Sequence, residues 1–277
     1  MSALQVIAPK PLPDGATRLF YGSDHYQFGD LRLPHGSGPF PVIIVIHGGF
    51  WKAKYSLDLM NPLCDDLTKR ELATWNIEYR RVEADEVSGN PGGGWPGTFL
   101  DVANAADYLR QIAPQYSLDL TRVVSLGHSA GGHLALWLAA RHNLPHASPL
   151  TTATAPLFLL GAVSQAGAND LQLMWQVRQH DSPVVNFLGG TPAEMPARYA
   201  LASPRQLLPL GLPQILIHGD ADENVPIELS RTYQAAAIAA GDSVTLVELP
   251  GVDHFAVIDP SSDAWAKTLP PLLALCG

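Results

Sequence analysis

The sequence predicts an α/β protein with a mostly parallel central sheet, helices on both faces of that sheet and an N-terminal antiparallel hairpin. Strand-like and helix-like segments alternate along the chain, which is typical of β-α-β units. Residues 41–46 are apolar and mostly β-branched without alternation, which favours a strand buried on both faces. Glycine-rich and polar motifs follow several strand segments, at the edge where a parallel sheet places its ligand site.

The elements are predicted in chain order from these patterns. Residues 18–21 and 25–33 alternate like the two strands of a hairpin. Residues 99–112 carry apolar side chains at spacings of three and four, which predicts a helix. The other expected strands are 41–46, 74–79, 122–126, 157–163, 214–218 and 243–249, and the other expected helices are 57–72, 129–142, 227–240 and 261–275.

The composition predicts one large domain spanning residues 1–277. Of the 277 residues, 47% are apolar and only 16% are charged, against a usual charged share of about 25%. Residues 169–200 form either a small cap or a plain surface excursion. The net charge of −9 argues against a nucleic-acid role and against a polybasic membrane anchor. We therefore expect a small-molecule substrate as partner, with no nucleic acid and no membrane, while the oligomeric state is not predicted.

Cysteines and apolar stretches give a default location. The two isolated cysteines, Cys64 and Cys276, exclude a disulfide framework. Residues 1–15 do not have the pattern of a signal peptide, and no apolar stretch reaches the about 20 residues of a membrane span. A cytoplasmic location is therefore expected. The histidines form no cluster with metal-ligand spacing, so no metal is expected.

Residues 127–131 read Gly-His-Ser-Ala-Gly, which fits G-x-S-x-G between a strand and a helix. In that context a sharp turn holds the serine in a strained backbone conformation and leaves its hydroxyl exposed. We therefore predict that Ser129 is a nucleophile. The alternative is a turn of small residues that lets the helix pack closely on the sheet.

Residues 47–51 read His-Gly-Gly-Phe-Trp directly after the buried strand, which is typical of an oxyanion loop. The predicted oxyanion donors are the backbone amides of Gly48, Gly49, Phe50 and Ala130. His47 is expected to brace this loop by hydrogen bonding rather than to act as the base. The candidate side chains of the substrate pocket are Phe50, Trp51 and Trp95. A role in the core remains open for the aromatic residues of the loop.

The acid and the base are predicted in two late loops, each of which follows a strand. Asp222 lies where a triad acid belongs, with Asp220 and Glu223 as competitors. The base candidate is His254. The chain order Ser129, Asp222, His254 matches the Ser…Asp…His order of one fold. In these roles the histidine takes the serine proton, and the aspartate fixes the imidazole tautomer and stabilises its charge.

Together these motifs resemble the α/β-hydrolase superfamily, in the branch that joins hormone-sensitive-lipase-like esterases with kynurenine formamidase (arylformamidase). The resemblance lies in residues 47–51, 127–133, 218–226 and 253–255 and covers the chain from about residue 41 to its end. Residues 76–81 and 92–99 are similar to formamidase-like members. The resemblance implies an α/β-hydrolase fold, hydrolysis of esters or aryl formamides, and no cofactor.

The leading interpretation is a serine hydrolase that cleaves a small carboxylic ester or an aryl formamide, such as N-formylkynurenine, through an acyl-enzyme intermediate. The alternatives are a general carboxylesterase without formamidase activity and a non-catalytic binding protein on the same fold. N-formylkynurenine carries a carboxylate, so formamidase activity would be favoured by a cation in the pocket. The sequence does not place Arg80, Arg81 or Arg178 there.

Overall fold

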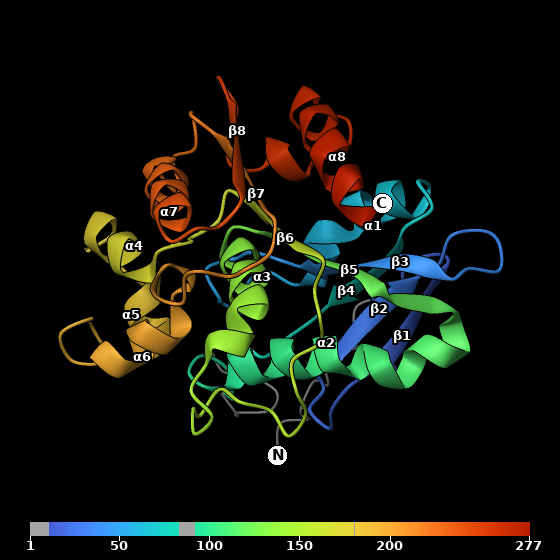
Figure 1. Ribbon diagram of the computed structural model, residues 1–277, viewed down its shortest axis with the longest axis horizontal. Coiled ribbons are helices and arrows are strands. Elements are labelled where there is room, and N and C mark those ends of the chain that lie inside the picture. The colour runs from blue at the N-terminus through green and yellow to red at the C-terminus, as the bar shows by residue number, and fades with distance from the viewer. Residues whose placement is uncertain (1–10, 83–91, 180) are drawn as a thin grey trace, which may run out of the picture.

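The computed structural model describes residues 11–82, 92–179 and 181–277. Within these residues the chain forms an eight-stranded sheet in the order β1-β2-β4-β3-β5-β6-β7-β8, with helices packed on both faces (Figure 1). The strands are β1 Ala16–Phe20, β2 Phe28–Arg32, β3 Phe40–Ile46, β4 Ala73–Ile77, β5 Leu118–His128, β6 Gly161–Gln165, β7 Gln214–Gly219 and β8 Val244–Leu249.

The strand directions confirm the predicted fold class. The hairpin strands β1 and β2 pair antiparallel, and β2 is also antiparallel to β4. All the other neighbouring strands, from β4 through β3 to β8, pair in parallel. The carboxyl ends of β3, β5, β7 and β8 therefore lie at one edge of the sheet, and the predicted motifs follow these four strands.

The helices occupy the predicted crossovers. They are α1 Asn61–Thr68, α2 Gly97–Tyr116, α3 Ala130–Ala140, α4 Leu171–Val177, α5 Pro183–Leu188, α6 Pro196–Ala202, α7 Glu228–Ala239 and α8 Asp263–Cys276, with 3-10 turns at Leu57–Met60, Arg141–Asn143, Pro204–Gln206 and Ala256–Ile258. No helix in the described ranges is long and apolar enough to cross a membrane. Residues 1–10, which hold most of the segment searched for a signal peptide, lie outside those ranges.

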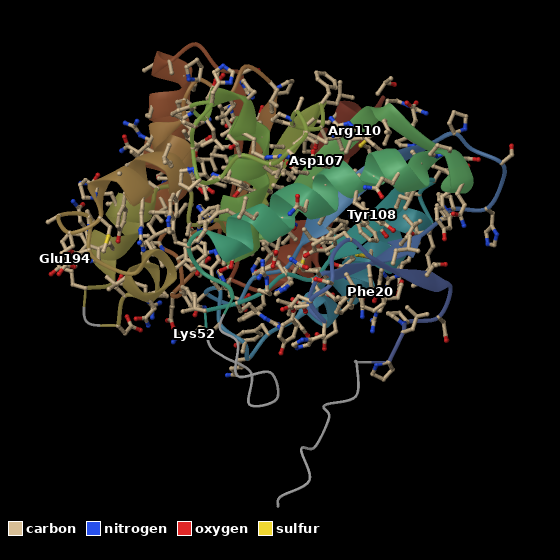
Figure 2. The ribbon with its side chains drawn as sticks, turned by 90° about the horizontal axis from the view of Figure 1, so that it is seen from below. Phe20, Lys52, Asp107, Tyr108, Arg110 and Glu194 are labelled. Atoms are coloured by element: carbon tan, nitrogen blue, oxygen red, sulfur yellow. The ribbon has the colours of Figure 1, made fainter. Side chains whose placement is uncertain are left out.

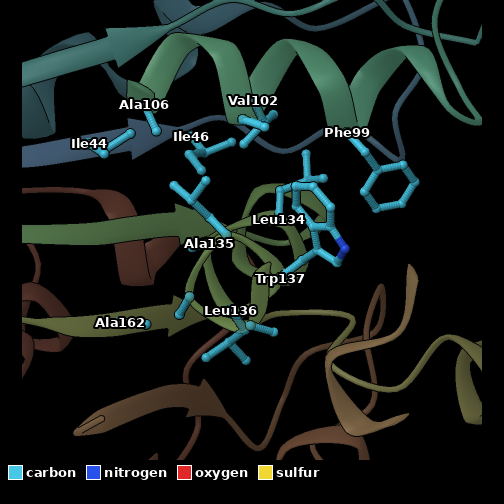
Figure 3. Packing of buried hydrophobic residues seen from close by; sticks show 14 of the residues in the cluster. Ile44, Ile46, Phe99, Val102, Ala106, Leu134, Ala135, Leu136, Trp137 and Ala162 are labelled. Atoms are coloured by element: carbon cyan, nitrogen blue, oxygen red, sulfur yellow. The ribbon is translucent and has the colours of Figure 1, made fainter. Parts of the chain in front are cut away.

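The central strand β3 is buried on both faces, as its apolar run predicts. Ile44 and Ile46 belong to the core on the α2 and α3 side, where Figure 3 shows them beside Val102 and Ala106 of α2. The alternate residues Ile43 and Val45 belong to a second core with α1 and α8. Each of these strand side chains is fully buried, and such burial stabilises the fold by about 1.5–3 kcal/mol per side chain.

A buried ion pair fixes α2 against the end of α3. Seen from below, α2 crosses the molecule, with Asp107, Tyr108 and Arg110 lying along it (Figure 2). The Asp107 carboxylate pairs with the guanidinium of Arg141 at 2.8 Å, and both side chains are almost fully buried. Because Arg141 directly follows α3, this contact ties the C-terminal end of α3, the helix that follows Ser129, to α2.

Two differences from the predicted elements have local causes. The strand predicted at 157–163 begins only at Gly161, because its pairing with β5 starts there, opposite Val124. The helices α4, α5 and α6 were not predicted, since each has only six or seven residues and shows too little periodicity. They occupy most of the segment 169–200.

Candidate active site

Ser129 lies in the sharp turn between β5 and α3. Its φ of 58° and ψ of −119° place it in a conformation that costs a non-glycine residue on the order of 1–3 kcal/mol. Close packing makes the flanking glycines necessary. A Cβ on Gly127 would lie 2.0 Å from the carbonyl oxygen of Gly131, and a Cβ on Gly131 would lie 2.0 Å from that of Ile46. The turn thus holds the serine at the N-terminus of α3, where the helix dipole favours negative charge.

His254 and Asp222 form a buried hydrogen-bonded pair, with 2.6 Å between Nδ1 of the histidine and Oδ2 of the aspartate. Because a carboxylate only accepts, Nδ1 donates, and Nε2 is left to accept a proton. Ser129 and His254 line the same pocket. Among the described residues the serine hydroxyl makes no hydrogen bond to His254, and catalytic bonds of this kind often tighten only when substrate binds.

The Asp222 carboxylate is held in its charged form by four hydrogen-bond donors. Its Oδ1 accepts from the amides of Asn224 (2.8 Å) and Val225 (2.9 Å). Its Oδ2 faces Nε2 of His218 at 3.3 Å as well as His254. Burial works to raise the pKa of Asp222, but the bonds from His218 and His254 outweigh it and hold that pKa well below its usual value.

The competing acids have other positions. Asp220 accepts a hydrogen bond from the amide of Gly251 at 2.6 Å and so shapes its turn. Glu223 is exposed. Asp253, next to the base, accepts hydrogen bonds at 2.9 Å from the amides two and three residues further along. Among the four acids Asp220, Asp222, Glu223 and Asp253, only Asp222 is hydrogen-bonded to the imidazole of His254.

The predicted oxyanion loop packs directly against Ser129. A Cβ on Gly48 would lie 2.9 Å from the Cβ of Ser129. Gly49 has a φ of +116°, and a Cβ there would lie 2.6 Å from the Cβ of Tyr55, so both the turn and the close approach need glycine. Within the described part of the chain, the amides of Gly49 and Ala130 have no hydrogen-bond acceptor. They are therefore available to an oxyanion.

A small pocket of about 40 Å³ opens beside Ser129. It is lined by Gly49, Phe50, Tyr55, Leu59, His128, Ser129, Asn224, His254 and Phe255. Of the three expected pocket side chains only Phe50 lines it. Trp51 is fully buried and stacks on Phe187 with 4.2 Å between ring centroids, so it belongs to the core. Trp95 packs its edge against Phe99 and does not line the pocket either.

A wider groove of about 720 Å³ lies next to this pocket. It is lined by Lys52, Trp175, Gln179, Asp181, Ser182, Val185, Asn186 and Thr191. Arg178 connects the two hollows. Its guanidinium lies 4.8 Å above the Phe50 ring, donates to the Asn224 carbonyl at 3.0 Å and pairs with Asp181 at 2.6 Å. Phe50 and Asn224 line the pocket, whereas Asp181 lines the groove.

The structure shows where Arg80, Arg81 and Arg178 lie relative to the pocket. Arg80 pairs with Asp101 at 2.7 Å, and Arg81 is almost fully buried beside Glu78. Neither lines the pocket or the groove. Arg178 is thus the arginine of the three that lies at the edge of the candidate site.

His128 and His218 also contact the site, although neither was assigned a role from the sequence. His128 donates from Nε2 to the backbone oxygen of His254 at 2.8 Å, and the two rings lie 4.6 Å apart. Burial, followed by the neighbouring His254 charge, lowers the pKa of His128 to about 3. A neutral His128 adds no positive charge against a protonated His254. His218 follows a buried strand and bonds Ser230 at 2.7 Å, which fixes its ring beside the acid.

The sheet order, the strained serine after β5 and the residues after β7 and β8 define an α/β-hydrolase. Within that class, the chain belongs to the BD-FAE family, whose model matches residues 30–236.

Among curated proteins the chain is similar to two esterases of Mycobacterium tuberculosis. It is 27% identical to esterase LipQ over 218 residues, which is 77% of this chain and 50% of LipQ. It is 27% identical to esterase LipC over 244 residues, which is 86% of this chain and 59% of LipC. The chain therefore spans about half the length of the curated relatives it matches.

Solved structures share the fold. A truncated carbohydrate esterase from gut microbiota superimposes with a TM-score of 0.80 at 22% identity, covering 96% of this chain and 99% of that one. Esterase 2 of Thermogutta terrifontis, phosphoramylated by tabun, superimposes with a TM-score of 0.76 at 23% identity, covering 96% of this chain and 95% of that one.

Proposed function

We propose that the protein is a serine hydrolase that cleaves a small carboxylic ester through an acyl-enzyme intermediate on Ser129. The carrying observation is that one pocket is lined by a strained serine, by Gly49 with its free amide and by His254, which is hydrogen-bonded to Asp222. These groups would serve as nucleophile, base with its acid, and oxyanion donor. The similarity to curated esterases supports the same class.

In the proposed acylation step, the Ser129 oxygen attacks the ester carbonyl carbon while Nε2 of His254 takes the hydroxyl proton. Asp222 keeps the proton on Nδ1 and stabilises the imidazolium that forms. Negative charge moves to the carbonyl oxygen, where the amides of Gly49 and Ala130 donate to it. His254 then gives its proton to the departing alcohol oxygen. In the second step the same histidine activates a water molecule, which releases the acid and restores the serine.

The small pocket and the wider groove indicate where the acyl part and the alcohol part of the ester would bind. The small pocket beside the serine has room for a short acyl group. The wider groove combines the indole of Trp175 with side-chain amides and hydroxyls, which suits the apolar face and the hydroxyls of a sugar. We therefore infer an acylated carbohydrate as the substrate class, and the fold neighbour described as a carbohydrate esterase supports this choice. Helices α4 and α5 would then act as a side wall for the alcohol part.

An aryl formamide is the second candidate, and Arg178 is the observation that favours it. Its guanidinium covers one pocket residue and borders the pocket, where it would meet the carboxylate of an N-formylkynurenine-like substrate. However, Asp181 already pairs with this arginine. That pairing makes the ester the preferred proposal.

A fluorophosphonate probe tests the nucleophile and excludes the non-catalytic alternative. The probe should form one adduct, on Ser129, and Ser129→Ala should abolish both labelling and hydrolysis of p-nitrophenyl acetate. The exposed Ser261 gives a matched control, because Ser261→Ala should change neither. Saturable ligand binding without turnover, or full activity in Ser129→Ala, would contradict the proposal.

The substrate class is tested by comparing kcat/KM for an acetylated methyl glucoside, p-nitrophenyl acetate and N-formylkynurenine. We expect the acetylated sugar to be preferred, and Trp175→Ala to raise KM for it while leaving the value for p-nitrophenyl acetate unchanged. A preference for N-formylkynurenine that is lost in Arg178→Gln would establish the formamide instead.

A further inference from the structure

His47, the first residue of the oxyanion loop, is a buried histidine whose two ring nitrogens both face acceptors. Nδ1 lies 2.8 Å from the carbonyl oxygen of Gly48, and Nε2 lies 3.0 Å from Oε1 of Glu78. A carbonyl oxygen only accepts hydrogen bonds, and so does a carboxylate. If Glu78 is ionised, both ring nitrogens must therefore carry a proton.

The surroundings of Glu78 favour its ionised form. Its Oε1 also accepts from the amide of Tyr79 at 2.9 Å, and its Oε2 accepts from the amide of Leu57 at 3.2 Å. The Arg81 guanidinium lies 3.5 Å away. Two backbone amides and the Arg81 guanidinium thus face this carboxylate independently of His47. Burial works to raise the pKa of Glu78, whereas His47, Arg81 and the Tyr79 amide together hold that pKa below its usual value.

The ring of His47 is also fixed in orientation. Tyr79 stacks on it with 4.3 Å between centroids and 10° between planes. The Tyr79 hydroxyl donates to the backbone oxygen of His47 at 2.8 Å. His128 differs, because within the described residues only its Nε2 has an acceptor, and burial lowers its pKa to about 3. The charged groups that face His47 are thus Glu78 and, behind it, Arg81.

The peptide unit that His47 contacts is the one that carries a proposed oxyanion donor. The carbonyl oxygen of Gly48 and the N–H of Gly49 belong to one peptide, which is trans. In a trans peptide these two groups point in opposite directions, so a donor behind the loop leaves the Gly49 N–H directed to the other side. Hydrogen bonds in such a chain polarise one another, by about 10–30% per bond.

We propose that His47 is a doubly protonated imidazolium, with Glu78 as its counter-ion, and that it strengthens the Gly49 amide as an oxyanion donor by polarising the Gly48–Gly49 peptide. His47 is a positioning residue, because it acts through the loop and touches no substrate. The role rests on the proposed serine hydrolase activity. The proposal also assigns Glu78, which directly follows β4, to the same reaction.

Nitrogen-15 NMR of ring-labelled histidines in the unmodified protein tests the protonation state without any substitution at the site. The His47 signals, assigned by their loss in His47→Gln, should show both ring nitrogens protonated at about pH 7.5. A pattern with one protonated nitrogen would overturn the proposal.

Kinetics test the catalytic consequence. Glu78→Gln removes the counter-ion at almost constant volume, and we expect kcat for p-nitrophenyl acetate to fall about 10–10²-fold with KM near the original value, a part of the loss seen when a whole oxyanion donor is removed. The exposed Glu71 gives the matched control Glu71→Gln, which should change neither constant. An unchanged kcat in Glu78→Gln would refute this inference, whereas activity in Ser129→Ala would refute the proposed function itself. If Glu78→Gln does not fold, the NMR measurement on the unmodified protein still decides.

Discussion

Lowering the pH from about 7 to about 5 should destabilise the folded protein, because two buried histidines are held neutral. Burial lowers the pKa of His128 to about 3 and that of His133 to about 4. In the unfolded chain each histidine has a pKa of about 6.5, so over this interval the unfolded state takes up protons that the folded state does not. The free energy of unfolding should fall by on the order of 2 kcal/mol for each histidine.

His133 offers the cleaner variant, because it lies outside the pocket. It is fully buried, donates from Nε2 to the Ala202 oxygen at 2.9 Å and meets the ring of Trp51 edge-on. Glutamine keeps a donor there but does not titrate. The carboxylates with lowered pKa, such as Asp222, lose their contribution only below about pH 4 and leave this interval unaffected.

Urea unfolding followed by tryptophan fluorescence, at the two pH values, measures the effect. The loss between about pH 7 and about pH 5 should be about 2 kcal/mol smaller in His133→Gln than in the unmodified protein. His146→Gln, at an exposed position, should show the unmodified loss. Since each variant is compared with itself at two pH values, any general destabilisation cancels. Equal losses in the two variants would refute the reasoning.

Three further changes test the site. Asp222→Asn should lower kcat about 10⁴-fold at similar KM, as the equivalent change does in serine proteases, while the exposed Glu223→Gln should have no effect on p-nitrophenyl acetate hydrolysis. Gly131→Ala places a Cβ 2.0 Å from the Ile46 oxygen. Thermal melting should therefore show that the free energy of unfolding falls by about 1–3 kcal/mol, and labelling by the fluorophosphonate probe should be lost. An unchanged melting temperature would contradict the geometry of the turn at Ser129. Tyr55→Ala should raise the rate ratio of p-nitrophenyl butyrate to acetate, and a constant ratio would show that Tyr55 does not limit the acyl group.

The sequence predicted the parts of the fold that local patterns determine. The apolar run at 41–46 predicts a strand buried on both faces, because no polar side chain interrupts it. The nucleophile loop and the late acid and base loops were found because each follows a strand end, where a parallel sheet exposes side chains. Their roles remain proposals, but the structure brings Ser129 and His254 to one pocket and bonds His254 to Asp222.

The parts that were missed depend on contacts between distant segments. Glu78 meets His47 only after β3 and β4 pair, and nothing in the sequence near either residue states that contact. The one local signal for Glu78 was an acidic residue near the end of the predicted strand 74–79. The short helices had clearer signals in Pro183 and Pro196, which stand at first helical positions, and in the side chain of Asp170, which caps α4.

The order of the strands also determines when activity can first appear during folding. The proposed nucleophile follows β5, whereas the acid and the base follow β7 and β8, which join the sheet only through pairings such as Ser164 with Leu216 and Ile217 with Val247. Parallel pairings of this kind close long loops and form slowly. For the proposed reaction, a chain that lacks β7 and β8 holds the serine without its acid and base, so recovery of activity on refolding requires these two strands in addition to β3 and β5.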